Sequence, residues 1–239
     1  MGLKGLLFDK DGTLIDFDAT WGPAVEAVMR HLAAGDRGRL ARLMEVSHFL
    51  EDERRFLPSS PLVAGSTQAF APDWAEALGR VPDAAFCAEV DGLLGRHGLE
   101  SLTPIGDPAA LFDRLAMRGL ALGVATNDSE ASARAQAQAL GIAARCPFIA
   151  GYDSGWGAKP GPGMITAFVE ASGLEPSEVA LVGDSLHDLH AAKAAGVVAI
   201  AVLSGPRRAA ARADLEPHAD HVLASIVDLE AFLDTLPLR

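Results

Sequence analysis

The sequence predicts an α/β fold in which a doubly wound, Rossmann-like parallel sheet carries an all-helical insert after its first strand. Short, wholly apolar runs recur along the chain, and such runs are typical of strands buried on both faces of a parallel sheet. Segments of helical periodicity separate the runs, which indicates repeated strand–helix–strand units. Between about residue 18 and residue 102 this alternation stops, and only helical patterns occur.

The first expected strand is Gly5–Phe8, a short apolar run that stops at Asp9. Later runs of the same kind predict five more strands, at Leu120–Ala125, Pro147–Ala150, Val179–Val182, Val197–Val202 and, with the weakest pattern, Asp220–Leu223. Helical periods between the strands predict four helices, at Asp107–Arg118, Ser129–Leu140, Gly163–Ser172 and Ser185–Ala195.

The insert is expected to contain helices and no strand. Its helical patterns fall at Trp21–Ala34, Arg37–Leu50, Ala71–Leu78 and Pro82–Arg96, and the proline-containing stretch Leu57–Pro61 interrupts them. We therefore expect two domains. Residues 1–16 and 103–239 would form the α/β domain, and residues 17–102 would form the helical one.

The composition narrows the class of partner. The chain has 239 residues, of which 49% are hydrophobic, and its net charge is −12. An acidic surface of this size disfavours nucleic acid and anionic membranes, and a small anionic substrate would need a locally positive site. Cys87 and Cys146 are far apart, which fits a reducing compartment. No apolar run approaches the roughly 20 residues that span a bilayer, and the N-terminus is too short for a signal peptide, so we expect a cytoplasmic protein.

Polar residues follow the expected strands, and in open α/β sheets ligands bind at the carboxyl ends of the strands. The first cluster is the run from Asp9 to Thr13. In an extended chain Asp9 and Asp11 point to the same side, so one carboxylate can attack an electrophile while the other transfers protons. Gly12 permits a sharp turn after them. The alternative is a simple turn with capping carboxylates.

Two further clusters have simpler alternative explanations. Thr126 and Asn127 follow an expected strand and precede a helix, where a hydroxyl and backbone N–H groups can bind an anion, or Asp128 and Ser129 can merely cap the helix. Lys159 lies in a glycine-rich loop, where it can neutralise a phosphate oxygen or simply be solvated.

The fourth cluster follows the strand expected at Val179–Val182. Asp184 and Asp188 are four residues apart, so they share a face at the start of a helix. Their hard oxygen ligands suit Mg²⁺, which is held by few carboxylates and keeps several waters. The alternative is helix capping, because the helix dipole favours negative charge at this end.

Taken in order, the four clusters resemble the motifs of the haloacid dehalogenase-like hydrolase superfamily. The resemblance covers nearly the whole chain and is most specific in Asp-x-Asp-Gly-Thr (residues 9–13) and Gly-Asp-Ser-x-x-Asp (residues 183–188). The helical insert is similar to the C1-type cap domain of this family. The resemblance therefore implies a phosphatase nearest the phosphoglycolate phosphatase-like members, acting on a small phosphorylated metabolite.

The resemblance also implies roles for individual residues. Asp9 would attack phosphorus and become an aspartyl-phosphate, and Asp11 would protonate the leaving alcohol and then activate water. Gly12, Thr126 and Asn127 would bind the phosphoryl oxygens. Lys159 would neutralise the phosphate and steady the nucleophile.

A magnesium ion is implied at the same place. By the resemblance, Mg²⁺ would be held by Asp9, the backbone carbonyl of Asp11, and Asp184. Asp188 would act indirectly or through water and would pair with Lys159. Two anions must meet in this reaction, and Mg²⁺ with Lys159 would reduce their repulsion.

Other activities remain open from the sequence. Asp11 favours phosphate esters over halide displacement, but a phosphosugar mutase uses the same two aspartates, and a non-catalytic phosphate-binding member is conceivable. A receiver domain would be much shorter and would carry no insert. The sequence does not choose between a monomer and a homodimer. His48, Arg54 and Arg55 are candidates for contacting a second anionic group of the substrate.

One residue of the first motif departs from the common family pattern. Lys10 replaces the usual apolar residue between the two aspartates. Alternation along an extended chain points its side chain away from them, so we expect Lys10 to have a structural role.

Overall fold

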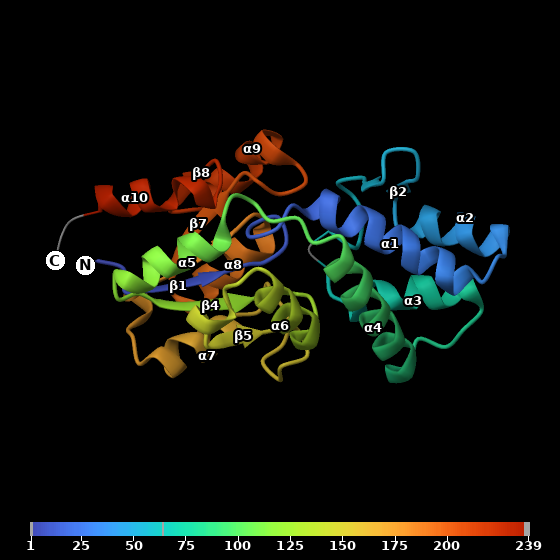
Figure 1. Cartoon of the computed structure of the whole chain (residues 1–239), viewed down its shortest axis with the longest axis horizontal. Helices are drawn as coiled ribbons and strands as arrows, with labels where there is room; N and C mark the ends of the chain where they lie inside the picture. The colour runs from blue at the N-terminus through green and yellow to red at the C-terminus, as the bar shows by residue number, and fades with distance from the viewer. Residues whose placement is uncertain (1, 64, 237–239) are drawn as a thin grey trace. The chain divides into compact units, whose positions relative to one another are not determined.

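The chain folds into two compact units in a computed structural model that describes residues 2–63 and 65–236 (Figure 1). One unit combines the residues up to Asp16 with those from Pro104 onward, and the other is Phe17–Thr103. Each unit has its own hydrophobic core.

The first unit is built on a parallel sheet of six strands, which confirms the predicted fold class. The strands lie in the order β5-β4-β1-β6-β7-β8, and every pairing is parallel. Both ends of each strand lie within one residue of the predicted limits. The strands are β1 (Gly5–Phe8), β4 (Ala121–Ala125), β5 (Phe148–Ala150), β6 (Val179–Gly183), β7 (Val198–Val202) and β8 (His221–Leu223).

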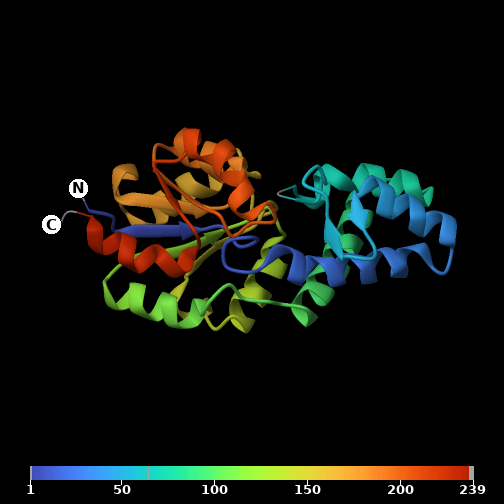
Figure 2. The ribbon, with the colours of Figure 1, turned by 90° about the horizontal axis from the view of Figure 1, so that it is seen from above.

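Helices cover both faces of this sheet (Figure 2). On one face Phe8 stacks against Phe112 with ring centroids 4.9 Å apart, while on the other Leu7 packs in one buried cluster with Phe168. The larger helices of the unit are α5 (Pro108–Met117), α6 (Glu130–Ala139), α7 (Gly163–Ser172), α8 (Leu186–Ala195) and α10 (Leu229–Thr235). Burial of β1 on both faces explains why its sequence is apolar without alternation.

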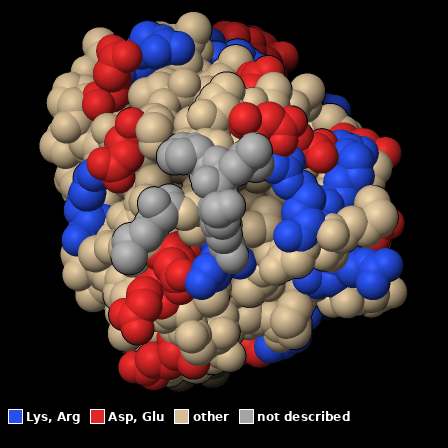
Figure 3. All heavy atoms as spheres, turned by 90° about the vertical axis from the view of Figure 1, so that its left-hand side faces the viewer, with Lys and Arg blue, Asp and Glu red and all other residues tan. Residues whose placement is uncertain are grey.

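Shorter helical elements complete the unit. They are the helix α9 (Arg212–Leu215) and five 3₁₀ turns, at Ala143–Arg145, Pro176–Glu178, Arg208–Ala211, Glu216–His218 and Ile226–Asp228. The face drawn in Figure 3 mixes acidic with basic side chains. Elsewhere in the unit, an ion pair links the end of α5 to α10, with Arg118 2.8 Å from Asp234.

The strand order determines where a ligand can bind. β1 lies between β4 and β6, with Phe8 opposite both Val124 and Val182. The chain runs to one side of β1 through β4 and β5 and to the other through β6, β7 and β8, so the direction of strand addition reverses at β1. Crevices at such reversal points, beyond the carboxyl ends of the strands, are where open α/β sheets bind ligands.

The second unit is mainly helical. Its helices are α1 (Phe17–Ala33), α2 (Arg37–Val46), α3 (Thr67–Leu78) and α4 (Ala84–Glu100). Trp74 of α3 is fully buried, and its indole Nε1 donates a hydrogen bond of 2.9 Å to the hydroxyl of Ser47. This bond satisfies the only polar atom of a large core side chain, which an apolar core requires.

The prediction of an all-helical insert was wrong in one place. Two short strands, β2 (Phe49–Leu50) and β3 (Arg55–Phe56), pair in antiparallel fashion. Helix α2 ends at Val46 rather than at the predicted Leu50, and His48 has a positive φ of 48° that a helix cannot continue through. Strands of two residues are too short to show the alternation by which strands are recognised.

None of the helices in the described ranges combines the length and the apolarity that a membrane span needs.

Candidate active site

The four polar clusters lie in the loops that follow β1, β4, β5 and β6, at the carboxyl edge of the sheet. The backbone N–H of Asp9 continues the pairing of β1 and donates 2.8 Å to the carbonyl of Val182. This bond fixes Asp9 at the point where the central strand ends. Side chains from the other three loops then meet around it.

Lys159 joins three of these loops. Its Nζ donates 2.6 Å to Oδ1 of Asp9, 2.6 Å to Oδ1 of Asp188 and 2.8 Å to the carbonyl oxygen of Ala125. The side chain is almost fully buried. Burial by itself would lower the pKa of Lys159, but the carboxylates of Asp188 and Asp9 outweigh it and raise that pKa above its usual value. The ammonium is therefore a permanent positive charge beside Asp9.

The loop after β4 supports this lysine and reaches the first motif. Asn127 accepts 2.8 Å from the backbone N–H of Lys159 and donates 2.9 Å to its carbonyl, so the two loops are clamped together. The hydroxyl of Thr126 donates 3.3 Å to Oδ2 of Asp11. Ser129 caps α6, accepting from the backbone N–H of Ser132. The helix cap left open by the sequence is therefore present at Ser129, and anion binding by Thr126 and Asn127 stays a prediction.

Asp188 is held by the start of its own helix. Ser185 caps α8, and both its backbone N–H, at 3.1 Å, and its hydroxyl, at 2.6 Å, donate to Oδ2 of Asp188. Oδ1 of Asp188 stays directed at Lys159. Helix capping and site building are therefore done by different oxygens of one carboxylate.

Three carboxylates face one another beside Lys159. Ligand oxygens of Asp9, Asp184 and Asp188 all lie within 4.8 Å of each other. Burial raises the pKa of Asp9 to about 7, an effect that Lys159 opposes and that Asp188 and Asp11 reinforce. Burial, reinforced by the charges of Asp9 and Asp188, also raises the pKa of Asp184 well above its ordinary value. One lysine does not balance this much negative charge, so the group is suited to a cation.

The carboxylate of Asp11 is turned toward Lys10 and Thr126. Nζ of Lys10 lies 2.9 Å from each of its two oxygens. Lys10 is buried and was expected to point away from the aspartates, so its contact with Asp11 was not foreseen. Alternation concerns the direction of the Cβ, whereas a four-carbon side chain is long enough to bring Nζ back to Asp11.

The loop after β7 also reaches the site, although the sequence analysis assigned it no role. The hydroxyl of Ser204 donates 2.8 Å to the carbonyl of Gly12. A Cβ at Gly205 would lie 1.9 Å from Oδ2 of Asp184, and one at Gly12, where φ is +79°, would lie 2.5 Å from the same oxygen. Asp184 is therefore enclosed by two glycines. A glycine soon after a strand was the only signal in the sequence.

Comparison with known proteins identifies the family. The profile of the haloacid dehalogenase-like hydrolases matches residues 3–196. The chain belongs to this family. A protein of Rhodospirillum rubrum named phosphoglycolate phosphatase is 33% identical over 86% of this chain and 81% of its own length. One of Xylella fastidiosa with the same name is 29% identical over 85% of this chain and 82% of its own length.

Two solved structures share the fold. A putative phosphoglycolate phosphatase of Lactobacillus delbrueckii subsp. bulgaricus superposes with a TM-score of 0.66 at 22% identity, over 98% of this chain and 99% of that one. A putative beta-phosphoglucomutase of Thermotoga maritima gives 0.68 at 20% identity, over 98% and 100%. At these identities the structures support the fold alone.

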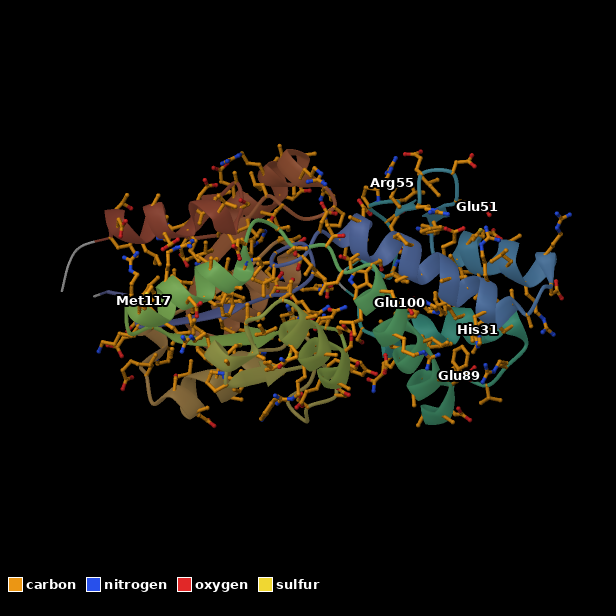
Figure 4. All side chains as sticks on the ribbon, in the orientation of Figure 1. His31, Glu51, Arg55, Glu89, Glu100 and Met117 are labelled. Atoms are coloured by element: carbon orange, nitrogen blue, oxygen red, sulfur yellow. The ribbon has the colours of Figure 1, made fainter. Side chains whose placement is uncertain are left out.

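In this hydrolase the three substrate-contacting candidates of the helical unit already have partners within that unit. Nδ1 of His48 lies 2.9 Å from the hydroxyl of Ser59, and Arg54 pairs with the buried Glu26 at 2.9 Å. Arg55, labelled in Figure 4, pairs with Glu53 at 2.6 Å. These contacts account for the three side chains without a substrate, so none of them is assigned to binding here.

Gly205→Ala is expected to lower the thermal unfolding midpoint of this hydrolase, because the new Cβ would overlap Asp184. Overpacking of this kind costs about 1–3 kcal/mol. Thermal unfolding followed by circular dichroism measures the effect. Gly92→Ala is the control, because Gly92, like Gly205, has no positive φ and a Cβ there meets nothing within 4 Å. A midpoint for Gly205→Ala at or above that of the wild type would show that Asp184 has room to move.

Proposed function

We propose that the protein is a Mg²⁺-dependent phosphomonoester hydrolase that works through an aspartyl-phosphate on Asp9. The observation that carries the proposal is the setting of Asp9. Its carboxylate lies 2.6 Å from Nζ of the buried Lys159. Its ligand oxygen and those of Asp184 and Asp188 lie within 4.8 Å of one another, close enough to share one metal ion, and Asp11 is two residues along the chain. A nucleophilic carboxylate, a cation site and a second acid are what hydrolysis through an acyl-phosphate requires.

The donor set fits a magnesium ion. Asp9 and Asp184 supply hard oxygen ligands, the backbone carbonyl of Asp11 would add another, and Asp188 would act through Lys159 or a water. Burial, reinforced by the neighbouring carboxylates, raises the pKa values of Asp9 and Asp184, and a divalent cation would favour their ionised forms. When bound, Mg²⁺ supplies charge neutralisation for the phosphate and orients it.

In the first step a carboxylate oxygen of Asp9 attacks phosphorus. The bond from phosphorus to the ester oxygen breaks, and the leaving alcohol takes a proton from Asp11. Lys159, the hydroxyl of Thr126 and backbone N–H groups near Gly12 and Asn127 hold the phosphoryl oxygens and stabilise the charge that develops on them.

In the second step water attacks the phosphorus of the aspartyl-phosphate. Asp11, now ionised, takes a proton from this water, and the bond between phosphorus and the Asp9 oxygen breaks. Inorganic phosphate is released, and Asp9 and Asp11 return to their starting states. The same carboxyl group thus serves first as acid and then as base.

Phosphoglycolate is the substrate that the relatives favour. Several proteins that match more than four fifths of this chain are named phosphoglycolate phosphatase, at 28–33% identity. We assign residues 1–16 and 103–239 to the hydrolase core and residues 17–102 to a cap that would exclude water during the reaction. A small phosphorylated metabolite, rather than nucleic acid or a membrane, is the proposed partner of a cytoplasmic enzyme, monomeric or homodimeric.

Phosphate release from a panel of phosphorylated metabolites tests the proposal. With Mg²⁺ we expect release that is fastest for phosphoglycolate and that stops when EDTA removes the metal. Release from other esters only would keep the phosphatase and change the substrate. A folded protein that releases no phosphate from any ester would refute the hydrolase, and a persistent phospho-enzyme needing a bisphosphate activator would favour the mutase.

Mg²⁺ is expected to raise the unfolding midpoint more at pH 8 than at pH 5.5. Asp9 has an ordinary pKa of 3.8 that burial raises to about 7 in the folded chain. Between these values the folded chain keeps a proton that the unfolded chain has lost, so stability without metal falls as pH rises, and Mg²⁺ must displace that proton at low pH. Scanning calorimetry with and without Mg²⁺ measures both trends, and equal metal shifts at the two pH values would contradict them.

A further inference from the structure

Lys10 occupies a buried polar site behind the first motif, where its ammonium donates hydrogen bonds to Asp11 and Gln136 and forms an ion pair with Asp128. Nζ lies 2.9 Å from the carboxylate of Asp11, 2.6 Å from Oε1 of Gln136 on α6 and 3.1 Å from Oδ2 of Asp128 in the loop after β4. The side chain of Lys10 is 2% exposed. Two hydrogen bonds and an ion pair to three different segments hold the ammonium in place.

Burying these polar groups lowers the stability of the fold. Burial by itself would lower the pKa of Lys10, and only the carboxylates of Asp11 and Asp128 raise it above its usual value. Gln136 is fully buried, and while its carbonyl oxygen accepts from Lys10, its amide nitrogen has no hydrogen-bond partner among the described residues. An apolar side chain would avoid burying an ammonium, but it would deprive the Gln136 carbonyl oxygen and the Asp128 carboxylate of this partner.

The contact with Asp11 offers a functional reason for burying Lys10 at this position. The Asp11 carboxylate is partly exposed, and the hydroxyl of Thr126 donates to it over 3.3 Å, a longer distance than the 2.9 Å to Lys10. Lys10 ties that carboxylate to Asp128 of the phosphate-binding loop and to α6 at once. The orientation of Asp11 is thereby linked to the loop that would hold the phosphoryl group.

We propose that Lys10 is a positioning residue that holds the Asp11 carboxylate in the orientation needed to protonate the leaving alcohol and then to accept a proton from water. The inference rests on the proposed function. It differs from a purely structural role in one respect: loss of Lys10 impairs proton transfer rather than the whole site.

The test compares two substrates with the full-length protein and Mg²⁺. An alkyl phosphate needs a proton on its leaving group, whereas 4-nitrophenyl phosphate leaves as a stable phenolate. In Lys10→Met we expect kcat/KM to fall about 10- to 100-fold for the alkyl ester, a partial loss of the roughly 10²–10⁴-fold that a general acid contributes, and less than about threefold for the aryl ester. A burst of nitrophenolate is also expected, because hydrolysis of the phospho-enzyme needs Asp11 as base.

Lys193→Met is the matched control, since Lys193 is an exposed lysine on α8 that pairs with Asp220, and both kcat/KM values should stay at the wild-type level. If Lys10→Met fails to fold because Asp128 is stranded, the double variant Lys10→Met/Asp128→Asn removes that charge and is measured instead. An equal loss for both esters, or no loss for either, would overturn the inference. Inactivity of the wild type on both esters would refute the proposed function itself, so the wild-type activity is measured before any variant is made.

Discussion

Asp9→Asn is expected to abolish phosphate release while leaving the chain folded. An amide is not nucleophilic enough to attack phosphorus, and removing a nucleophile from a group that acts as a unit lowers kcat by at least about 10⁴-fold. The amide oxygen can still accept from Lys159, which lies 2.6 Å from the present carboxylate. The fold should therefore keep this contact.

Stability separates loss of chemistry from loss of structure in this variant. Burial raises the pKa of Asp9 to about 7, so at pH 8 the metal-free protein holds an ionised group that its surroundings disfavour. The asparagine side chain carries no charge, so the unfolding midpoint of Asp9→Asn without metal should equal or exceed that of the wild type at pH 8, and the increase caused by Mg²⁺ should shrink. Scanning calorimetry at pH 8 with and without Mg²⁺ measures both.

The control for Asp9→Asn is Asp113→Asn. Asp113 is exposed and pairs with Arg145 at 2.7 Å, outside the site. Its variant should release phosphate at the wild-type rate. If Asp9→Asn kept more than about a hundredth of the wild-type kcat, with contamination by the wild-type enzyme excluded, Asp9 would not be the nucleophile.

The sheet could be predicted closely because of how a parallel sheet is buried. A strand such as Val179–Gly183, covered on both faces, is a continuous apolar run whose ends are marked by polar loop residues. Short elements gave no such signal. The β2–β3 pair has two residues in each strand, and α10 is a seven-residue helix that buries Leu229 and Leu233, too little to establish a helical period.

The site could be predicted in part for a similar reason. A residue that follows a strand of a parallel sheet is located by the strand itself, so Asp9, Thr126 and Asp184 could be assigned to one edge without coordinates. Contacts made at the far end of a long side chain could not. Alternation predicts the direction of the Cβ of Lys10, but three further carbons carry its Nζ back to Asp11. The approach of Gly205 to Asp184 depends on how a distant loop packs.

Lys159→Met is expected to produce the largest loss of stability of any single change at the site, together with near-complete loss of turnover. The ammonium is buried and contacts Asp9, Asp188 and the carbonyl of Ala125. Removing one partner of a buried ion pair leaves the other charge uncompensated, which costs about 3–5 kcal/mol. Turnover should fall because nothing else among these contacts neutralises the oxygen that attacks phosphorus.

The pH dependence of that loss distinguishes stranded charge from lost packing. Lys159 opposes the rise in the pKa of Asp9, so without it Asp9 should keep its proton to a higher pH in the folded chain. At pH 5 the carboxyl group can stay neutral, and the loss of stability should be small. At pH 8 the buried Asp9 carboxyl either ionises without a partner or keeps a proton that the unfolded chain releases. Both lower the free energy of unfolding, so the loss of stability should be larger. Urea unfolding at both values measures the difference between Lys159→Met and the wild type, with Lys193→Met as the exposed control. A loss of the same size at both pH values would mean that Lys159 contributes through packing of its methylene groups, and that another group neutralises the nucleophile.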